Sequence, residues 1–447
     1  MRIVVVGAGK LGYSVAQLLA DDQYDVVVIE QDEKRREVVK NSLDVLTIGA
    51  NGASPMTMQE GFVKDADMLL ASTDSDEANM IICSLAKQNG VKHTVARIRN
   101  TDYAQLSDAF LKDTMKIDMI LNPEQITAKE INRILMTPAA LNVEDYAEGR
   151  VRMFEVKLRK DSPFAGIPLK KLEIPKQILV AMIFRNNEMI IPHGDDVMRD
   201  NDHVFFVGGK DVVHDFESEF TTTHSKAERV IIIGAGRTGR FLAPLLEQQG
   251  LFVKIIDKNK ERCQLIAQKL NRGIALHGDG TDIDLLVEEG IAEADVVVCV
   301  TEDDKLNLLL ALLAKHLGAA KTIVRVARNE YVELMEKVGV DIVLSSRLLS
   351  SGEVLRFIRR GGVVSVSLLE GAKAEAIELI LPENSPIAGK RLRDAALDKE
   401  CLVCAVVHDN EVVVPNGDTV LWPGDRVVIF VKAGYVKIVM PAFEGQE

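Results

Sequence analysis

The sequence predicts an α/β protein in which two doubly wound parallel-sheet domains alternate with two small α+β modules. The stretch VVVGAGKLG at 4–12 recurs as IIIGAGRTG at 231–239. Each copy opens a series in which short β-branched runs alternate with helical ones, such as RIVVV, KLGYSVAQLLADD and DVVVI. This alternation is typical of parallel strands joined by crossover helices. The remaining segments have turn signals between short strands and no glycine fingerprint, which indicates small α+β modules.

The self-similarity extends well beyond the glycine-rich stretch. The later strands and helices of the two sheet domains are related, and so are the two segments that follow those domains. Because both kinds of segment are duplicated, the repeating unit is a sheet domain followed by a small module. The matching segments are 65–98 with 293–326, 161–172 with 384–395, and 190–207 with 413–430.

We therefore expect four domains. The polar stretch TTTHSKAE at 221–228 marks the boundary before the second copy. Two amphipathic stretches, EQITAKEINRIL and SSGEVLRFIRR, are expected to form the last helix of each sheet domain. Their apolar residues either complete the core there or pair domains, within one chain or between chains. The expected domains are 1–140, 141–224, 225–363 and 364–447.

Length and composition narrow the class of protein. A chain of 447 residues with 47% hydrophobic and 27% charged residues is an ordinary globular protein of several domains. Its formal charge of −13 argues against a nucleic-acid partner, because phosphate binding needs clustered Lys and Arg. No apolar run approaches the about 18 residues of a membrane helix, and a strand directly after Met-Arg leaves no room for a signal peptide. We expect a cytoplasmic protein, and the composition leaves open whether it docks on a membrane protein.

Both glycine-rich stretches have the context of a dinucleotide site. Each follows a strand, opens a helix, and is followed by an acid 23 residues after its first glycine. The first glycine permits the tight turn, the second lets the backbone approach a phosphate, and the third allows close packing of helix and strand. The phosphate would bind the helix N-terminus, and the acid would bind ribose hydroxyls and disfavour NADP. The expected residues are Gly7, Gly9, Leu11, Gly12 and Glu30 in the first copy, and Gly234, Gly236, Thr238, Gly239 and Asp257 in the second.

Other polar residues stand at the carboxyl edge of each predicted sheet, where ligands of such sheets bind. They are a cation after the second glycine, a side chain at the tip of the third strand where an adenine would lie, a threonine after the fourth strand, and an arginine that ends the fifth. These residues are Lys10, Asn51, Thr73 and Arg97 in the first copy, and Arg237, Asp279, Thr301 and Arg325 in the second.

Structural interpretations stay open for all of these residues. The glycines could serve only tight turns, the acids could be exposed strand ends, and the cations could be solvated. Thr73 and Asp76, like Thr301 and Asp304, also fit a helix-capping arrangement. Because Asn51 replaces Asp279, the two sites need not prefer the same nucleotide.

The sequence argues against catalysis. A dehydrogenase needs a general acid or a metal opposite the nicotinamide. The duplicated modules share no such group, since His203 aligns with Arg426 and His193 with Asn416. The CxxC at 401–404 lies in a predicted strand, which sends its two thiols to opposite faces, so we expect no metal site there. An NAD-dependent oxidoreductase and a scaffold without ligands remain the alternatives.

The chain resembles the TrkA-type regulatory subunits of Trk potassium uptake systems, which carry two tandem RCK (KTN) units. Each unit is a Rossmann RCK-N domain followed by an RCK-C module. The resemblance covers the whole chain and is carried by the doubled GAGxxG, the TxxDxxN stretches at 73–79 and 301–307, ARIR at 96–99, and the repeated SPxAG and PxGDxV turns.

The resemblance implies a function and partners. It implies a gating ring, a homotetramer with eight lobes, on the inner face of the membrane beneath a TrkH-type potassium-conducting subunit. ATP, ADP, NAD or NADH would bind as regulatory ligands, and Lys10 and Arg237 would contact the terminal phosphate of ATP. No catalytic residue and no metal is expected.

Overall fold

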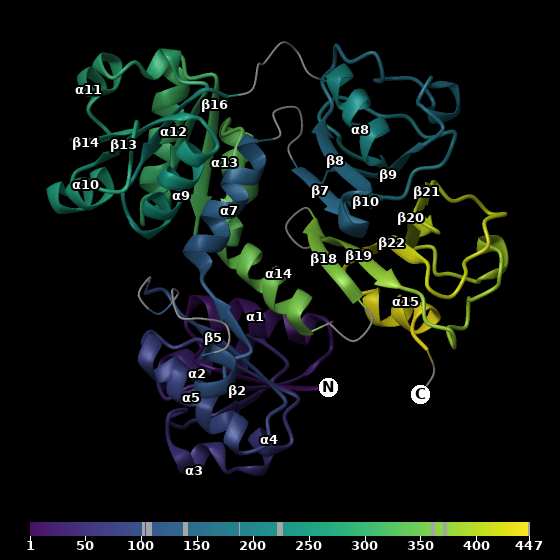
Figure 1. The fold of residues 1–447 in the computed structure, drawn as a ribbon, viewed down its shortest axis with the longest axis horizontal. Helices are drawn as coiled ribbons and strands as arrows, with labels where there is room; N and C mark the ends of the chain where they lie inside the picture. The colour runs from purple at the N-terminus through teal and green to yellow at the C-terminus, as the bar shows by residue number, and fades with distance from the viewer. Residues whose placement is uncertain are drawn as a thin grey trace. The chain divides into compact units, whose positions relative to one another are not determined.

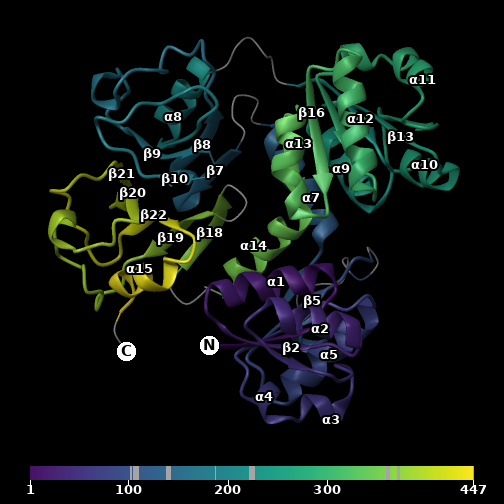
Figure 2. The ribbon, with the colours of Figure 1, turned by 180° about the vertical axis from the view of Figure 1, so that it is seen from behind.

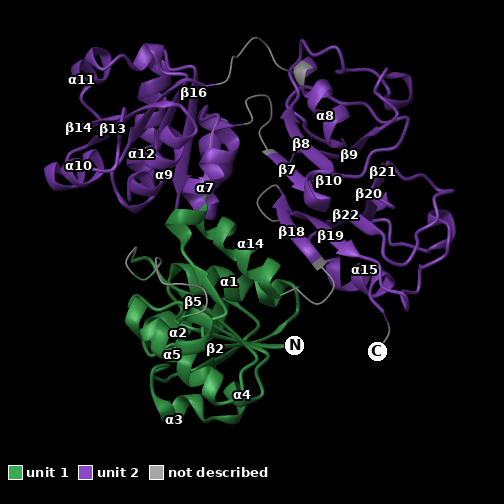
Figure 3. Ribbon diagram, viewed as in Figure 1, with its two compact units in different colours: residues 1–126, 345–358 green, residues 127–344, 359–447 purple. Residues whose placement is uncertain are grey.

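The computed structural model describes residues 1–100, 103, 110–136, 142–186, 188–220, 227–358, 363–369 and 373–445 (Figure 1). The chain forms two compact units, coloured separately in Figure 3. Unit 1 consists of residues 1–126 and 345–358, and unit 2 of residues 127–344 and 359–447. No helix in the described part of the chain is long and apolar enough to cross a membrane.

Unit 1 is built on a six-stranded sheet with the strand order β3-β2-β1-β4-β5-β6. All of its strand pairs are parallel, and the order is that of a doubly wound dinucleotide-binding fold. Its strands are β1 Arg2–Val6, β2 Asp25–Ile29, β3 Leu46–Ile48, β4 Met68–Ala71, β5 His93–Arg97 and β6 Met119–Leu121. Its connecting helices are α1 Lys10–Asp21, α2 Glu33–Ser42, α3 Pro55–Met58, α4 Gly61–Lys64 and α5 Asp76–Gln88, with a π-helical turn at Phe110–Thr114.

A helix from the second repeat completes unit 1. Helix α14, Ser346–Ile358, packs against α1 and β6, and the views in Figures 1 and 2 both place it beside α1. The Phe357 ring meets the His93 ring edge-on, with centroids 5.8 Å apart. The sequence predicts this helix correctly, but the idea that it completes the core of its own sheet is wrong. The helical spacing of apolar residues predicts that one face of a helix is buried, but it does not indicate which sheet covers that face.

Unit 2 contains the second six-stranded sheet, with the equivalent order β14-β13-β12-β15-β16-β17. Its strands are β12 Arg229–Ile233, β13 Phe252–Asp257, β14 Ile274–His277, β15 Val296–Cys299, β16 Lys321–Val326 and β17 Ile342–Ser345. Its helices are α9 Arg237–Gln248, α10 Lys260–Ala267, α11 Ile283–Glu288, α12 Asp304–His316 and α13 Val332–Val338, with short 3₁₀ helices at Ile291–Glu293 and Asn329–Tyr331.

Helix α7, Pro123–Leu135, is the counterpart of α14. Its buried residues Ile131 and Leu135 belong to the hydrophobic core that contains Leu242 and Leu246 of α9 and Ile232 of β12. The last helix of the first repeat therefore packs on the second sheet. The two repeats exchange their crossover helices within one chain, which is the pairing within a chain that the sequence left open.

Two antiparallel five-stranded sheets form the small modules, so the predicted alternation of fold classes is confirmed. Their orders, β10-β9-β11-β8-β7 and β21-β20-β22-β19-β18, are equivalent. The strands are β7 Asn142–Tyr146, β8 Val151–Lys157, β9 Ile178–Arg185, β10 Glu188–Ile190 and β11 His203–Gly209, then β18 Val363–Leu369, β19 Ala374–Ile380, β20 Cys401–His408, β21 Glu411–Val413 and β22 Arg426–Lys432. The helices are α8 Lys210–Glu217 and α15 Val436–Phe443, with 3₁₀ helices at Ala147–Gly149, Leu169–Lys171, Ser218–Phe220 and Leu392–Asp394.

The two modules share one hydrophobic core. Phe205 of the first module and Phe430 of the second are fully buried in it, with ring centroids 6.4 Å apart. Cys404 lies in this shared core, whereas Cys401 lies in the separate core of the second module. The two thiols of the CxxC therefore occupy opposite faces of β20, as their spacing predicts.

Candidate functional site

The first and third glycines of each turn are required by the fold itself. Gly7 has φ +94° and Gly234 has φ +115°, a left-handed conformation that side chains disfavour. A Cβ on Gly12 would lie 1.9 Å from the carbonyl oxygen of Gly7, and one on Gly239 would lie 2.0 Å from that of Gly234. These four glycines would be needed for strand-to-helix packing even in a protein that bound nothing.

The middle glycine of each turn is not required by the fold. Gly9 and Gly236 both have φ −65°, which any residue adopts. A Cβ on Gly9 would have no atom within 4 Å, and one on Gly236 would meet only a guanidinium nitrogen of Arg262 at 4.0 Å. The backbone is left bare here beside the first turn of a helix, which is what close approach of a phosphate requires.

Helix amides line this bare backbone. The first intrahelical bond of α1 runs from the Tyr13 amide to the Gly9 carbonyl at 2.9 Å, so the amides of residues 10–12, including that of Leu11, precede it. In α9 the first such bond runs from Arg240 to Gly236 at 3.0 Å, which leaves residues 237–239, including Thr238, in the same position. Amide hydrogens and the helix dipole together favour an anion at each N-terminus.

The strand-end acids brace the glycine turns. Glu30 is buried, and its two oxygens accept from the amides of Ala8 at 2.7 Å and Asp32 at 2.9 Å. Asp257 is also buried and accepts from Ala235 at 2.7 Å and Asn259 at 2.8 Å. The interpretation as exposed strand ends is wrong for both acids. Each carboxylate joins the glycine turn to the start of the next helix, in addition to any contact with a ribose.

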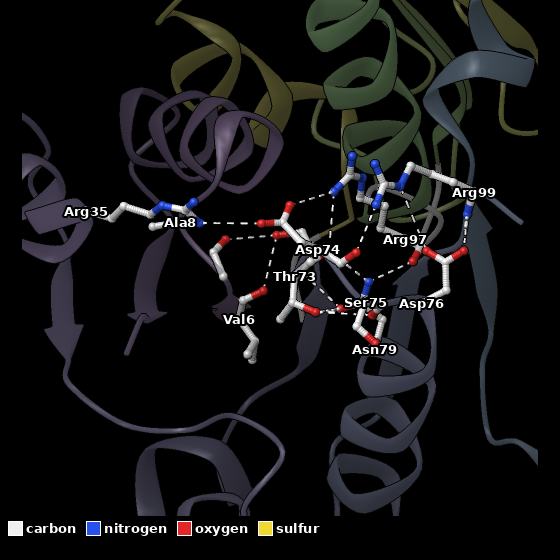
Figure 4. A network of polar contacts seen from close by, with 12 residues as sticks. Val6, Ala8, Arg35, Thr73, Asp74, Ser75, Asp76, Asn79, Arg97 and Arg99 are labelled. Atoms are coloured by element: carbon white, nitrogen blue, oxygen red, sulfur yellow. Dashed lines mark hydrogen bonds and ion pairs between the residues drawn. The ribbon is translucent and has the colours of Figure 1, made fainter. Parts of the chain in front are cut away.

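An Asn missed as a site residue organises the adjacent edge in both copies. The Asn79 side chain is fully buried and accepts from the Thr73 amide at 2.9 Å and hydroxyl at 2.7 Å. Its amide group donates to the Thr73 carbonyl at 3.2 Å and to the Arg97 carbonyl at 2.8 Å, as seen in Figure 4. Asn307 makes the same four bonds to Thr301 and Arg325. The signal that could have identified it is the TxxDxxN spacing, which is the same in both repeats.

The helix cap lies one residue before the expected acid. Ser75 accepts from the Ala78 amide at 3.1 Å and caps α5. Asp76 instead accepts from the amides of Arg99 at 2.9 Å and Asn100 at 2.8 Å, and holds the segment after β5. Asp303 caps α12, and Asp304 holds the amides of Ala327 and Arg328 in the same way. The capping interpretation of Thr73 with Asp76 is therefore wrong.

Arg97 ends β5 and Arg325 is the next-to-last residue of β16, and both side chains are partly buried at this edge. The Arg97 guanidinium donates to the Thr73 carbonyl at 3.3 Å, and its Nε has no partner among the described residues. Burial lowers the pKa of Arg97, and the nearby charge of Arg99 adds to this effect. A carboxylate oxygen of Asp74 lies 3.8 Å from Arg97, and the other lies 3.8 Å from Arg35. Figure 4 draws both ion pairs. Arg325 donates to the Thr301 carbonyl at 3.5 Å. Neither arginine is the solvated surface cation that the sequence allowed.

The remaining predicted residues are exposed. Lys10 and Arg237 begin α1 and α9 at the mouths of the glycine turns. Asn51 and Asp279 follow β3 and β14. The Oδ1 atom of each accepts a hydrogen bond from the backbone amide two residues ahead, at 2.9 Å. The structure thus brings the predicted residues of each copy to the carboxyl edge of their own sheet.

The small modules hold charged pairs instead of a site of that kind. Each module sets one His and one Arg against two buried carboxylates, and the His and the Arg exchange places between the two modules. No group of three metal-ligating side chains occurs among the described residues. The pairs are Arg185–Asp202 at 2.7 Å and His203–Glu155 at 2.8 Å in the first module, and His408–Asp425 at 2.6 Å and Arg426–Glu378 at 3.0 Å in the second.

Comparison with known families covers most of the chain. The TrkA-N domain matches residues 3–123 and 230–346, and the TrkA-C domain matches residues 153–221 and 376–441. The Trk system potassium uptake protein TrkA homolog 1 of Methanosarcina mazei is 39% identical over 438 residues, which cover 96% of this chain and 97% of that protein. The Trk system potassium uptake protein TrkA of Halomonas elongata is 35% identical, with 96% of each chain covered.

Solved structures share the fold. The GsuK RCK domain matches with a TM-score of 0.63 at 18% identity, over 98% of this chain and 93% of that one. The GsuK channel bound to NAD matches with a TM-score of 0.63 at 17% identity, over 99% of this chain and 78% of that one. Both domain types are matched twice, and more than a third of the residues are identical to relatives over nearly their whole length, so the chain belongs to the TrkA family of Trk system potassium uptake proteins.

Proposed function

We propose that this chain is a nucleotide-sensing regulatory subunit of a TrkH-type potassium uptake system. In this proposal each repeat binds an adenine nucleotide, ATP, ADP, NAD or NADH, at its glycine turn, and bound nucleotides bias the shape of a ring that acts on the membrane subunit. A ligand shifts such an equilibrium only by the difference between its affinities for the two shapes. The nucleotide acts as a ligand and leaves chemically unchanged.

One observation carries the proposal: the middle glycine of each turn has no role in packing. Gly9 and Gly236 leave bare backbone at a helix N-terminus, in a conformation that would admit a side chain. A duplicated fold that only scaffolds gives no reason for both copies to keep that position free. The same fold in GsuK has been solved with NAD and, at a TM-score of 0.52, with ADP, which supports nucleotides as the ligand class.

We assign roles to the remaining residues on this basis. Amides at residues 9–12 and 236–239 would hold phosphate, while Glu30 and Asp257 would accept ribose hydroxyls through lone pairs not used by the backbone. The cations and edge residues would face the terminal phosphate or the base; they are Lys10, Asn51, Thr73, Arg97, Arg237, Asp279, Thr301 and Arg325. We retain the domains 1–140, 141–224, 225–363 and 364–447, a homotetramer, and a peripheral position on the inner face of the membrane as parts of the proposal.

The test uses Gly9→Asp and Gly236→Asp in the full chain. Asp is a favoured N-cap residue, so each variant should keep its helix while its carboxylate occupies the place of the phosphate. Calorimetry should give two ADP per chain for wild type, one for each variant and none for the double variant. Gly61→Asp is the matched control. A Cβ at Gly61 also meets no atom within 4 Å, and Gly61 lies at the start of a helix, α4.

The same variants test regulation. ATP and ADP should support different potassium flux through the reconstituted membrane partner, and the double variant should abolish that difference. A wild-type chain that saturates with one ADP would refute the two-site claim. Equal flux with ATP, with ADP and without nucleotide would refute the regulatory role.

A further inference from the structure

The loop after the third strand of each sheet returns across the carboxyl edge toward the glycine turn. In unit 1 a Cβ on Gly52 would lie 2.1 Å from the Val6 side chain at the end of β1. In the second sheet a Cβ on Gly280 would lie 2.5 Å from Ile233 at the end of β12. The residue just before each of these glycines is therefore held above the edge where phosphate and ribose would bind.

The strand order sets what this position would contact. Phosphate would lie at the turn after β1, and ribose at the acid that ends β2, one strand further along the sheet. The base then lies on the β3 side, under the returning loop. Asn51 and Asp279 are the side chains that this loop presents, and both are exposed.

Asn51 presents a hydrogen-bond donor. Its Oδ1 accepts from the Ala53 amide at 2.9 Å. A backbone amide only donates, so the atom held inside the turn must be the side-chain oxygen. The atom left for a ligand is Nδ2, which can donate and cannot accept.

Asp279 presents an acceptor at the equivalent place. Its Oδ1 accepts from both the amide and the hydroxyl of Thr281, at 2.9 and 2.8 Å. The atom left for a ligand is Oδ2. The bonds from Thr281, backbone first, lower the pKa of Asp279, so the carboxylate is charged at neutral pH. The same turn thus presents opposite hydrogen-bonding polarity in the two repeats.

A second exchange reinforces this difference. In the first repeat the Arg36 guanidinium lies over Gly49, 2.7 Å from where a Cβ would be, and donates to the Glu30 carbonyl at 3.3 Å. In the second repeat Cys263 stands in place of Arg36 and His277 in place of Gly49. The Arg36 guanidinium therefore has no counterpart at the equivalent position of the second repeat, where the charge of Lys258 acts on Asp279 instead.

We propose that the second site selects adenine through Asp279, whereas the first site accepts 6-oxopurine nucleotides through Asn51 and Arg36. The inference rests on the proposed function, in which both glycine turns bind adenine nucleotides, and adds 6-oxopurine nucleotides as ligands of the first. The 6-amino group of adenine donates to a carboxylate, and the 6-oxo group of hypoxanthine or guanine accepts from an amide or a guanidinium. The two repeats then respond to different nucleotide pools.

Single-site forms of the full chain test the proposal with ADP and inosine diphosphate as probes. Gly9→Asp leaves the second site, which should bind ADP at least about tenfold more tightly than inosine diphosphate, the factor expected for a hydrogen bond to a charged group. Gly236→Asp leaves the first site, which should bind inosine diphosphate at least as tightly as ADP.

Exchanging the two residues should exchange the preferences. Asp279→Asn in the Gly9→Asp background should bring the two affinities within about threefold, and Asn51→Asp in the Gly236→Asp background should create a preference for ADP of about tenfold. Both substitutions keep Oδ1 and hence the turn. Asn416→Asp is the matched control, because the Oδ1 of Asn416 also accepts an amide two residues ahead, at 2.8 Å, outside both sites.

Two outcomes separate the inference from the function on which it rests. ADP binding at both sites with the same ratio of affinities would overturn the inference and leave the proposed function intact. Absence of saturable ADP binding to the wild-type chain would overturn both.

Discussion

Replacing Asn79 by alanine should destabilise unit 1 locally, at the carboxyl ends of β4 and β5. Asn79 is fully buried and joins the end of β4 to the end of β5 through four hydrogen bonds. In Asn79→Ala the Thr73 amide and the Arg97 carbonyl each lose their hydrogen bond to the Asn79 side chain. A buried polar group deprived of its partner costs about 1–3 kcal/mol, so the two together should lower the free energy of unfolding by about 2–6 kcal/mol.

Amide hydrogen exchange can measure this effect locally, which suits a chain of two units that need not unfold together. The amides of β4 and β5 should exchange at least about 30-fold faster, the factor given by about 2 kcal/mol. Asn307→Ala should act in the same way on β15 and β16 and spare unit 1. Asn89→Ala is the control, since Asn89 lies at the end of the same helix with one bond to the Leu85 carbonyl. An acceleration below about threefold in Asn79→Ala would show that the network is not a brace.

Two further predictions concern packing and pH. Gly12→Ala should disrupt unit 1, because its Cβ would lie 1.9 Å from the Gly7 carbonyl oxygen. Thermal unfolding should show the lower stability of unit 1. ADP binding at the second repeat should persist. The pKa of His408 is raised by its hydrogen bond to Asp425 and then by the charge of that carboxylate. The protonated pair therefore stabilises the second module fully below the ordinary His pKa of about 6.5, and this stabilisation is lost as pH rises through the raised pKa. The midpoint of unfolding should fall less between pH 6 and pH 8 in His408→Gln than in wild type. An equal fall in the two proteins would show that the His408–Asp425 pair does not contribute this stability.

Local spacing was enough to predict the glycine turns. Each is set by a strand, a turn and a helix that are contiguous in the sequence, so Gly7 with its φ of +94° and Gly12 with its close contact follow from the pattern. The bracing role of Glu30 was missed because the spacing of an acid at a strand end says nothing about which amides will meet it. Asn79 was missed for a related reason, since an Asn inside a helix gives no sign of burial, and only its repetition at Asn307 marks it.

The destination of the crossover helices could not be read from the sequence at all. Apolar residues at helical spacing predict that one face of α14 is buried, and the structure buries it on α1, which carries the first glycine turn. Likewise α7 shares a core with α9, which carries the second. Each helix that begins at a glycine turn thus packs against a helix from the other repeat. A protein with one repeat could complete its sheet in this way only by exchange with a second chain, whereas duplication supplies both partners in one polypeptide. The repeated glycine turn and the exchanged helices are therefore two parts of one arrangement: each helix that begins at a glycine turn, α1 or α9, packs in a core completed by a helix from the other repeat.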